Sequence, residues 1–164
     1  MECGIALGSN SGDRLASLRS AVAALRRLDP DVRVSPAYET APVDCPEGSE
    51  SFLNAAAILR WNKSPEALLA FLRGIESYLG RPAVRHRNAP RSIDLDILYA
   101  GDTVRADGDL TLPHPRLHLR RFVLQPLCDL CPDLRLPGFT LTVRQLLGGL
   151  PPENPPPRRI EEPL

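Results

Sequence analysis

Length, composition and charge exclude several classes of protein at the outset. The chain has 164 residues, 43% of them hydrophobic and 24% charged, which suits one soluble domain with its own core. Lys and Arg number 20 and Asp and Glu also number 20, so no overall basic field would attract nucleic acid or a membrane. No stretch approaches the roughly 20 apolar residues of a membrane span, and we expect a cytoplasmic protein.

The N-terminal segment is predicted to form a strand followed by a helix. Residues 3–10 alternate apolar and small side chains and end in the turn-forming Gly8-Ser9-Asn10. The helix is predicted from five apolar residues at helical spacing: Leu15, Leu18, Val22, Leu25 and Leu28.

Two further strands are predicted on either side of a loop. Residues 31–40 form the second strand, the loop covers 41–50, and residues 51–61 form the third strand. Because side chains alternate along a strand, Phe52 and Asn54 should lie on one face.

A second helix is predicted to begin at Ser64-Pro65-Glu66, with a capping hydroxyl and a proline in the first turn. Gly80 ends it. Its apolar face comprises Leu68, Leu69, Leu72, Ile75 and Leu79.

The remaining elements complete an α+β pattern. A basic loop at 81–92 precedes a strand at 93–99 and a short return strand through Val104, and a helix follows within 113–132 until prolines stop it. The order β-α-β-β-α-β is that of a ferredoxin-like sandwich, an antiparallel sheet covered by helices, with short elements appended. Residues 151–164 are proline-rich and charged, which predicts a flexible tail after a single domain at 1–150.

The segment "RNAPRSIDLDILYAGD" carries the strongest chemical signal. In a strand, Asp94 and Asp96 share one face roughly 6.5 to 7 Å apart, while Ile93, Leu95 and Ile97 enter the core. A bare D-x-D is most often a solvated sheet face. Neighbouring carboxylates repel unless something positive lies between them, so a Mg²⁺ ion is the functional alternative.

Cations around this pair favour the functional reading. Five basic residues precede it in a chain of zero net charge: Arg81, Arg85, His86, Arg87 and Arg91. Arginine forks bind phosphate oxygens. The combination therefore indicates a metal and polyphosphate site, although the chain has neither a G-x-x-x-x-G-K-[ST] loop nor a kinase glycine loop.

Two aromatic and polar clusters have both structural and functional readings. Phe52 could stack a flat ring while Asn54 bonds its edge, although core packing explains Phe52 alone. A second cluster contains His114, Arg120, Arg121 and Phe122, and a solvated helix face explains its arginines equally well.

The chain contains four cysteines: Cys3, Cys45, Cys128 and Cys131. They are too few and too uneven for a disulfide framework, so reduced thiols are expected. Cys128 and Cys131 could join His114 and His118 in a zinc set, because C-x-x-C and H-x-x-x-H are ligand spacings. The alternative is that the two cysteines are small buried residues near a helix end.

Taken together, the motifs resemble one enzyme family. In order stand "LGSN", "Y-E-T-A-P" with "F-L-N-A-A", "E-x-x-x-G-R…R-x-x-P-R-x-I-D-L-D-I-L", and "L-P-H-P" with "R-x-F-V-L-x-P-L". From about residue 4 to 137 the chain resembles the 6-hydroxymethyl-7,8-dihydropterin pyrophosphokinases. The long arginine-to-aspartate motif carries most of the specificity.

The resemblance implies transfer of the β,γ-pyrophosphoryl group of ATP to the hydroxymethyl oxygen of a dihydropterin, giving AMP and the pterin diphosphate for folate synthesis. Two Mg²⁺ ions would be held by Asp94 and Asp96. The implied catalytic set is Asp94, Asp96, Arg81 and Arg91. The implied pterin set is Thr40, Pro42, Val43, Phe52, Asn54 and Phe122. The implied ATP set is Leu69, Arg73, Glu76, Arg81, Arg87, Arg91, Ile97, Thr111, His114 and Arg120.

The chain also departs from the pattern of this family. Asn88 stands where members often have an aromatic, Ala83 stands where a second arginine is common, and Phe52 stands where a tyrosine is common. The loops 41–50 and 81–92 are expected to act as lids over the substrates.

We expect a monomer acting on ATP and the dihydropterin. Three rival readings remain: a module that senses a nucleotide and metal without turnover, an ordinary kinase that makes ADP, and an RNA-binding sheet. The third conflicts with 5% aromatic residues and zero net charge.

Overall fold

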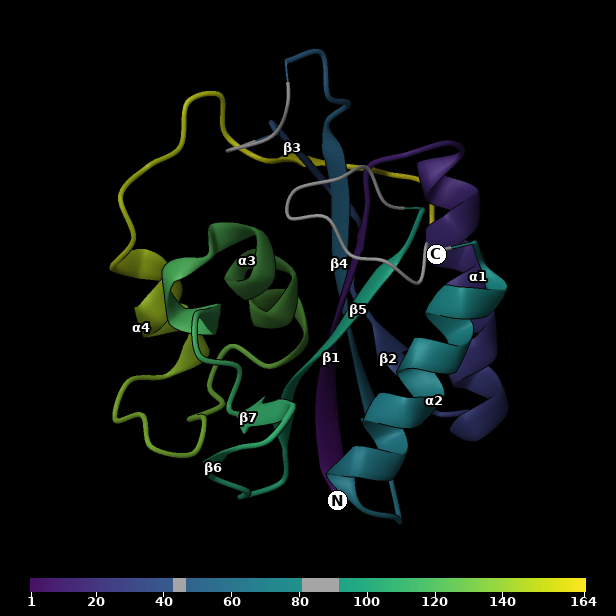
Figure 1. Ribbon diagram of the computed structural model, residues 1–164. Coiled ribbons are helices and arrows are strands. Elements are labelled where there is room, and N and C mark those ends of the chain that lie inside the picture. Colours follow the sequence, from purple (N-terminus) through teal and green to yellow (C-terminus); the bar gives the residue numbers. More distant parts are fainter. Residues whose placement is uncertain (43–46, 81–91) are drawn as a thin grey trace.

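The structure is a computed structural model that describes residues 1–42, 47–80 and 92–164. A six-stranded antiparallel sheet runs through its centre (Figure 1). The spatial order is β5-β1-β4-β3-β8, and β2 also pairs with β4. The strands are β1 (Glu2–Ser9), β2 (Arg33–Val34), β3 (Tyr38–Thr40), β4 (Phe52–Arg60), β5 (Asp94–Ala100) and β8 (Arg158–Arg159). The order β5-β1-β4-β3 confirms the predicted ferredoxin-like arrangement.

Helices α1 (Arg14–Leu28) and α2 (Pro65–Tyr78) lie together on one side of the sheet (Figure 1). Both begin at side-chain caps: Asp13 accepts from the Ala16 N–H at 3.0 Å, and Ser64 accepts from the Ala67 N–H at 3.2 Å. Their buried leucines join the main core against the inward side chains of β1, β4 and β5. The predicted helix positions and the capping role of Ser64 are confirmed.

The other face carries a second, smaller core. The short helix η1 (Leu117–Leu119) and the helices α3 (Arg121–Leu130) and α4 (Val143–Gly148) lie on this side (Figure 1). They bury Ala56, Ile58, Leu98 and Tyr99 of the sheet. Asp94 and Asp96 precede Leu98 on this same face and are only half-buried, so the helices leave one end of the face open.

Three predicted elements differ from the structure in detail. The predicted second strand is split into β2 and β3, because Pro36 has no N–H to donate to the ladder. The return strand begins only at Arg105, where β6 (Arg105–Asp107) pairs with β7 (Leu110–Leu112). The predicted helix within 113–132 is divided into η1 and α3, and α3 tolerates Pro126 and ends at Leu130.

The end of the expected flexible tail is attached to the sheet. Arg158 and Arg159 of β8 pair with β3, and the Ile160 N–H donates to the Ala37 carbonyl at 2.8 Å. Ile160 and Leu164 pack against the main core. The composition indicated mobility, but β3 would otherwise be an edge strand with unpaired backbone groups, and the terminal residues satisfy them.

None of the helices in the described ranges is long and apolar enough to cross a membrane.

Candidate active site

The two aspartates lie at the open end of the second face. Asp94 and Asp96 are half-buried, whereas Leu95 and Ile97 between and beyond them are each 3% exposed in the main core. In the neighbouring strand β1, Asp94 stands opposite Gly8 and Asp96 opposite Ala6. The prediction that the two aspartates share one face is therefore confirmed. Gly8 and Ala6, which stand beside them in β1, are too small to crowd the two carboxylates.

A polar row crosses three strands at this level. Gly8 is paired with Asp94 on one side and with Asn54 of β4 on the other. Directly opposite residues share a face, and neighbouring strands are about 4.8 Å apart, so Asp94 and Asn54 face the same space roughly 10 Å apart. A Cβ at Gly8 would stand 3.3 Å from the Asn54 Oδ1 atom. The glycine of "LGSN" thus leaves room for the Asn54 amide.

The predicted pterin residues of β3 and β4 are brought together. Asn54 is 6% exposed, and its Nδ2 atom donates a hydrogen bond to the Thr40 Oγ1 atom at 2.9 Å. Thr40 is paired with Phe52, which is half-buried on the same face. Pro42 follows on the surface.

A cationic and aromatic group, His114, Arg120 and Phe122, lies within electrostatic reach of the aspartates. His114 is anchored to β5, because its backbone N–H donates to the Leu98 carbonyl at 2.8 Å. The Arg120 guanidinium carbon lies 5.5 Å from the centroid of the Phe122 ring, whose residue is 36% exposed. Burial and the nearby Arg116 lower the pKa of Arg120, while the charges of Asp96 and Asp94 act in the opposite direction. Arg120 is therefore within electrostatic range of both carboxylates.

Glu76 has a structural contact that the sequence did not reveal. It is 3% exposed, and its Oε1 atom accepts the Leu95 N–H at 2.8 Å. Leu95 lies between the two aspartates, so Glu76 ties β5 to α2 at that position. The one signal in the sequence was that Glu76 stands among the apolar residues of the predicted helix face.

The remaining predicted ATP residues are not gathered beside the aspartates: some lie in or against the main core on the opposite face, and others lie outside the described residues. Arg73 of α2 forms an exposed ion pair with Asp109 at 3.5 Å, beside the β7 strand that carries Thr111. Leu69 packs against the main core, and the Ile97 side chain is buried in it. Four predicted residues fall outside the described ranges: Val43, Arg81, Arg87 and Arg91.

The aspartate pair suits a hard cation, and the alternative zinc set does not form. Two carboxylates on one half-exposed face offer the oxygen ligands that Mg²⁺ takes, with the rest supplied by phosphate or water. Within residues 1–42, 47–80 and 92–164, no group of three or more His, Cys, Asp and Glu side chains could hold a metal ion. The His118 ring instead lies 5.4 Å from Phe139, and burial raises the pKa of Cys131 to about 12.

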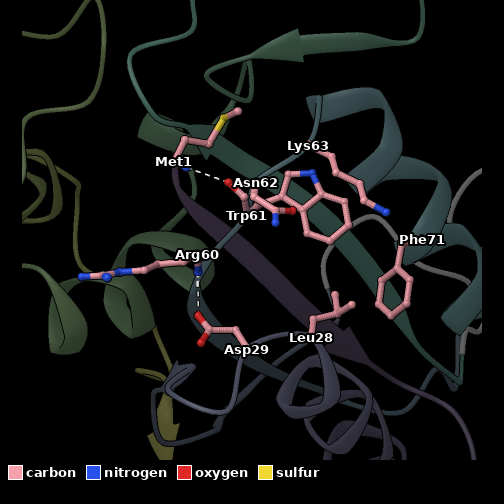
Figure 2. A pocket seen from close by; sticks show the side chains of 8 residues that line it. All are labelled: Met1, Leu28, Asp29, Arg60, Trp61, Asn62, Lys63 and Phe71. Atoms are coloured by element: carbon pink, nitrogen blue, oxygen red, sulfur yellow. Dashed lines mark hydrogen bonds between the residues drawn. The ribbon is translucent and has the colours of Figure 1, made fainter.

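A separate pocket of about 630 Å³ lies at the other end of the sheet (Figure 2). It is bounded by the start of β1 and the end of β4, far along both strands from Gly8 and Asn54. Its lining residues are Met1, Leu28, Asp29, Arg60, Trp61, Asn62, Lys63 and Phe71. No predicted site residue is among them, so this hollow is distinct from the aspartate site.

His114 should titrate well below an ordinary histidine. Burial, followed by the charges of Arg120 and Arg116, lowers the pKa of His114 from 6.5 to about 4, so the imidazole is neutral at pH 7. Between these values the unfolded chain binds more protons, so the stability contributed by neutral His114 is present above about pH 6.5 and is lost as the pH falls toward 4. We expect a midpoint near pH 4 for the His114 ring protons by NMR, and a midpoint near 6.5 would contradict the described burial.

Comparison with known proteins first defines the fold and then the family. A crystal structure of HPPK-DHPS in complex with substrates has a TM-score of 0.65 at 14% identity, covering 90% of this chain and 43% of that chain. Plasmodium falciparum HPPK-DHPS with pteroate has a TM-score of 0.66 at 16% identity, covering 90% and 42%. These likenesses establish the α+β fold, and the chain spans under half the length of those proteins.

The family model for 7,8-dihydro-6-hydroxymethylpterin-pyrophosphokinase (HPPK) matches residues 4–132. A Pseudomonas aeruginosa 2-amino-4-hydroxy-6-hydroxymethyldihydropteridine pyrophosphokinase is 42% identical over 137 residues, 81% of this chain and 82% of the relative. The Bacillus subtilis protein of the same name is 43% identical over 129 residues, 77% and 76%. The Dictyostelium discoideum folic acid synthesis protein FOL1 is 34% identical over 90% of this chain but only 22% of its own length. The chain belongs to the HPPK family and is a pyrophosphokinase of folate synthesis.

Proposed function

We propose that the protein transfers pyrophosphate from ATP to the hydroxymethyl group of 6-hydroxymethyl-7,8-dihydropterin, in a reaction that depends on Mg²⁺. The single observation that carries this proposal is the row from Asp94 across Gly8 to Asn54. This row places the carboxylates of Asp94 and Asp96 on the same face of the sheet as the polar and aromatic side chains of β3 and β4. Donor and acceptor of the pyrophosphoryl group could then meet between them.

The β3 and β4 side of the row suits the pterin. A dihydropterin is flat, with hydrogen-bonding groups along one edge. The bond to Thr40 uses one donor of the Asn54 amide, which has two donors and an acceptor. Phe52 and Phe122 approach from the sheet and from α3, and aromatic rings on two sides would stack the ligand. These contacts would orient the hydroxymethyl group toward β5.

The β5 side suits the triphosphate of ATP. Asp94 and Asp96 would hold Mg²⁺, and we propose two ions; when bound, they would neutralise phosphate charge and polarise the hydroxyl group. Arg120 adds a positive charge within electrostatic range of the carboxylates. His114 is neutral, so it can donate one hydrogen bond without adding charge. Arg81, Arg87 and Arg91 are proposed as further phosphate ligands from the sequence pattern.

The chemical step needs alignment and charge neutralisation more than covalent catalysis. The hydroxyl oxygen attacks the β-phosphorus atom, and the bond from that atom to the oxygen of the α-phosphate breaks. AMP leaves with that oxygen, and the hydroxyl proton passes to Asp96 or to water.

One assay separates the proposal from its rivals. Purified protein is incubated with ATP, Mg²⁺ and the hydroxymethyldihydropterin, and the nucleotide products are resolved by chromatography. We expect AMP in a one-to-one ratio with the pterin diphosphate, and neither product without Mg²⁺. ADP would indicate an ordinary kinase, and the absence of any nucleotide product would indicate a sensing module.

A further inference from the structure

Arg14, the first residue of α1, joins the two ends of the segment between β3 and β4. Its Nη1 atom donates to both the carbonyl and the hydroxyl oxygen of Ser51, each at 2.7 Å. Its Nη2 atom donates to the Glu39 Oε2 atom at 3.1 Å. Glu39 immediately precedes Thr40, and Ser51 immediately precedes Phe52. One guanidinium therefore holds the chain just before both residues.

Glu39 is held from its other side by the C-terminal strand. Its Oε1 atom accepts from the Arg158 Nη2 atom at 3.0 Å, and Arg158 is paired with Glu39 in the ladder between β8 and β3. Arg158, together with Arg14, holds the pKa of Glu39 below its usual range. The carboxylate thus stays ionised between two cations, one from each end of the chain.

The burial of the Arg14–Glu39 pair distinguishes it from ordinary surface ion pairs, although its third member, Arg158, is 68% exposed. The side chains of Arg14 and Glu39 are 24% and 26% exposed, whereas those of Arg144 and Asp133 in α4 and its preceding loop are 65% and 85% exposed. Exposed pairs contribute little, but multiple charge-assisted bonds to a partly buried guanidinium fix its partners in place. We define Arg14, Glu39 and Arg158 as the clamp.

The clamp acts at the most easily lost part of the ladder. The pairing of Thr40 with Phe52 is the last between β3 and β4, after Glu39 with Leu53 and Tyr38 with Asn54. Terminal pairs of a ladder open first, because they have neighbours on one side only. Opening there would separate Thr40 from Phe52 and weaken the hydrogen bond from Asn54 to Thr40 while leaving the main core intact.

We propose that the clamp positions Thr40 and Phe52 for the dihydropterin ring, which makes Arg14 and Glu39 positioning residues for the acceptor substrate. This inference rests on the proposed function, because it assigns a substrate to these contacts. Its consequence is selective: loss of the clamp should weaken binding of the pterin and leave binding of ATP, which the proposed function places at β5, nearly unaffected.

Steady-state kinetics test this selectivity. In Arg14→Gln and Glu39→Gln we expect KM for the pterin to rise about tenfold, the scale of one lost charged hydrogen bond, with KM for ATP unchanged within about twofold. Arg14→Lys should recover part of the loss, because one ammonium group reaches Glu39 or Ser51 but cannot replace both arms. The matched control Arg144→Gln removes an exposed arginine from its pair with Asp133 and should behave as wild type. Equal increases in both KM values, or none, would overturn the proposal.

A structural measurement separates this inference from the proposed function. Amide hydrogen exchange should become faster at Thr40 and Phe52, the last pair of the β3–β4 ladder, in Arg14→Gln and Glu39→Gln, but not in Arg144→Gln. The double variant Arg14→Gln/Glu39→Gln should have a smaller effect on both readouts than the product of the single effects, because the two residues share one bond. Faster exchange with an unchanged KM for the pterin would refute the positioning role while leaving the proposed function intact. Wild-type protein that makes no AMP would refute the proposed function itself, and the positioning role with it.

Discussion

Replacing Asp96 with Ala should reduce kcat by on the order of 10³-fold or more while the protein stays folded. Asp94 and Asp96 of β5 are the two carboxylates proposed to hold Mg²⁺, so half of the proposed protein ligands would be lost. Because Asp96 is half-buried and lies outside both cores, we expect the protein to stay folded, with little change in its thermal midpoint. The value of kcat is measured by AMP formation at saturating substrates.

The control for this variant is Asp133→Ala, which removes an aspartate whose side chain is 85% exposed in a pair with Arg144. It should retain wild-type kcat. If Asp96→Ala kept more than about a tenth of wild-type turnover, Asp96 would have no place in the metal site or in the chemical step.

Replacing Gly4 with Ala should lower the free energy of unfolding by about 3 kcal/mol or more. A Cβ at Gly4 would lie 2.3 Å from the Cε1 atom and 2.7 Å from the Cδ1 atom of Tyr99, distances that real Cβ atoms do not show. Tyr99 is 2% exposed, and its hydroxyl donates to the Glu2 Oε1 atom at 2.8 Å. The ring is therefore enclosed and held at its far end, and it cannot rotate away from a new Cβ without losing these contacts. Either the Tyr99 ring, which belongs to the second core, or strand β1, whose buried residues belong to the main core, must move.

Urea denaturation of Gly4→Ala beside Gly74→Ala tests this steric account. Gly74 lies inside α2, and a Cβ there would meet nothing within 4 Å. Gly74→Ala should therefore be neutral or stabilise the protein by up to about 1 kcal/mol. Equal stabilities for the two variants would show that Tyr99 yields and that the close approach at Gly4 is not needed.

The parts of the fold that local pattern governs could be predicted. The cap at Ser64 with Pro65 behind it marks the start of α2, and the alternation around Leu95 marks β5 and the common face of its aspartates. In both cases the signal lies within a few residues. Local spacing alone determines which side chains face the core.

The parts that depend on contacts distant in sequence could not be predicted. Composition alone predicted a flexible tail at residues 151–164. The attachment of its end depends on the free edge of β3, which pairs with Arg158 and bonds Ile160. The contacts of Arg14 join residues 25 and 37 positions away, and no local pattern indicates them. The contact of Glu76 with the Leu95 N–H is likewise visible only once α2 and β5 are packed together.

Binding of Mn²⁺ in place of Mg²⁺ tests most directly whether Asp94 and Asp96 form the metal site. Electron paramagnetic resonance can count protein-bound Mn²⁺ in the presence of α,β-methylene-ATP, whose carbon bridge blocks the bond that breaks. We predict two bound ions per wild-type chain, and at least about tenfold weaker binding in the folded Asp94→Asn/Asp96→Asn variant. Undiminished Mn²⁺ binding in that variant would contradict the account.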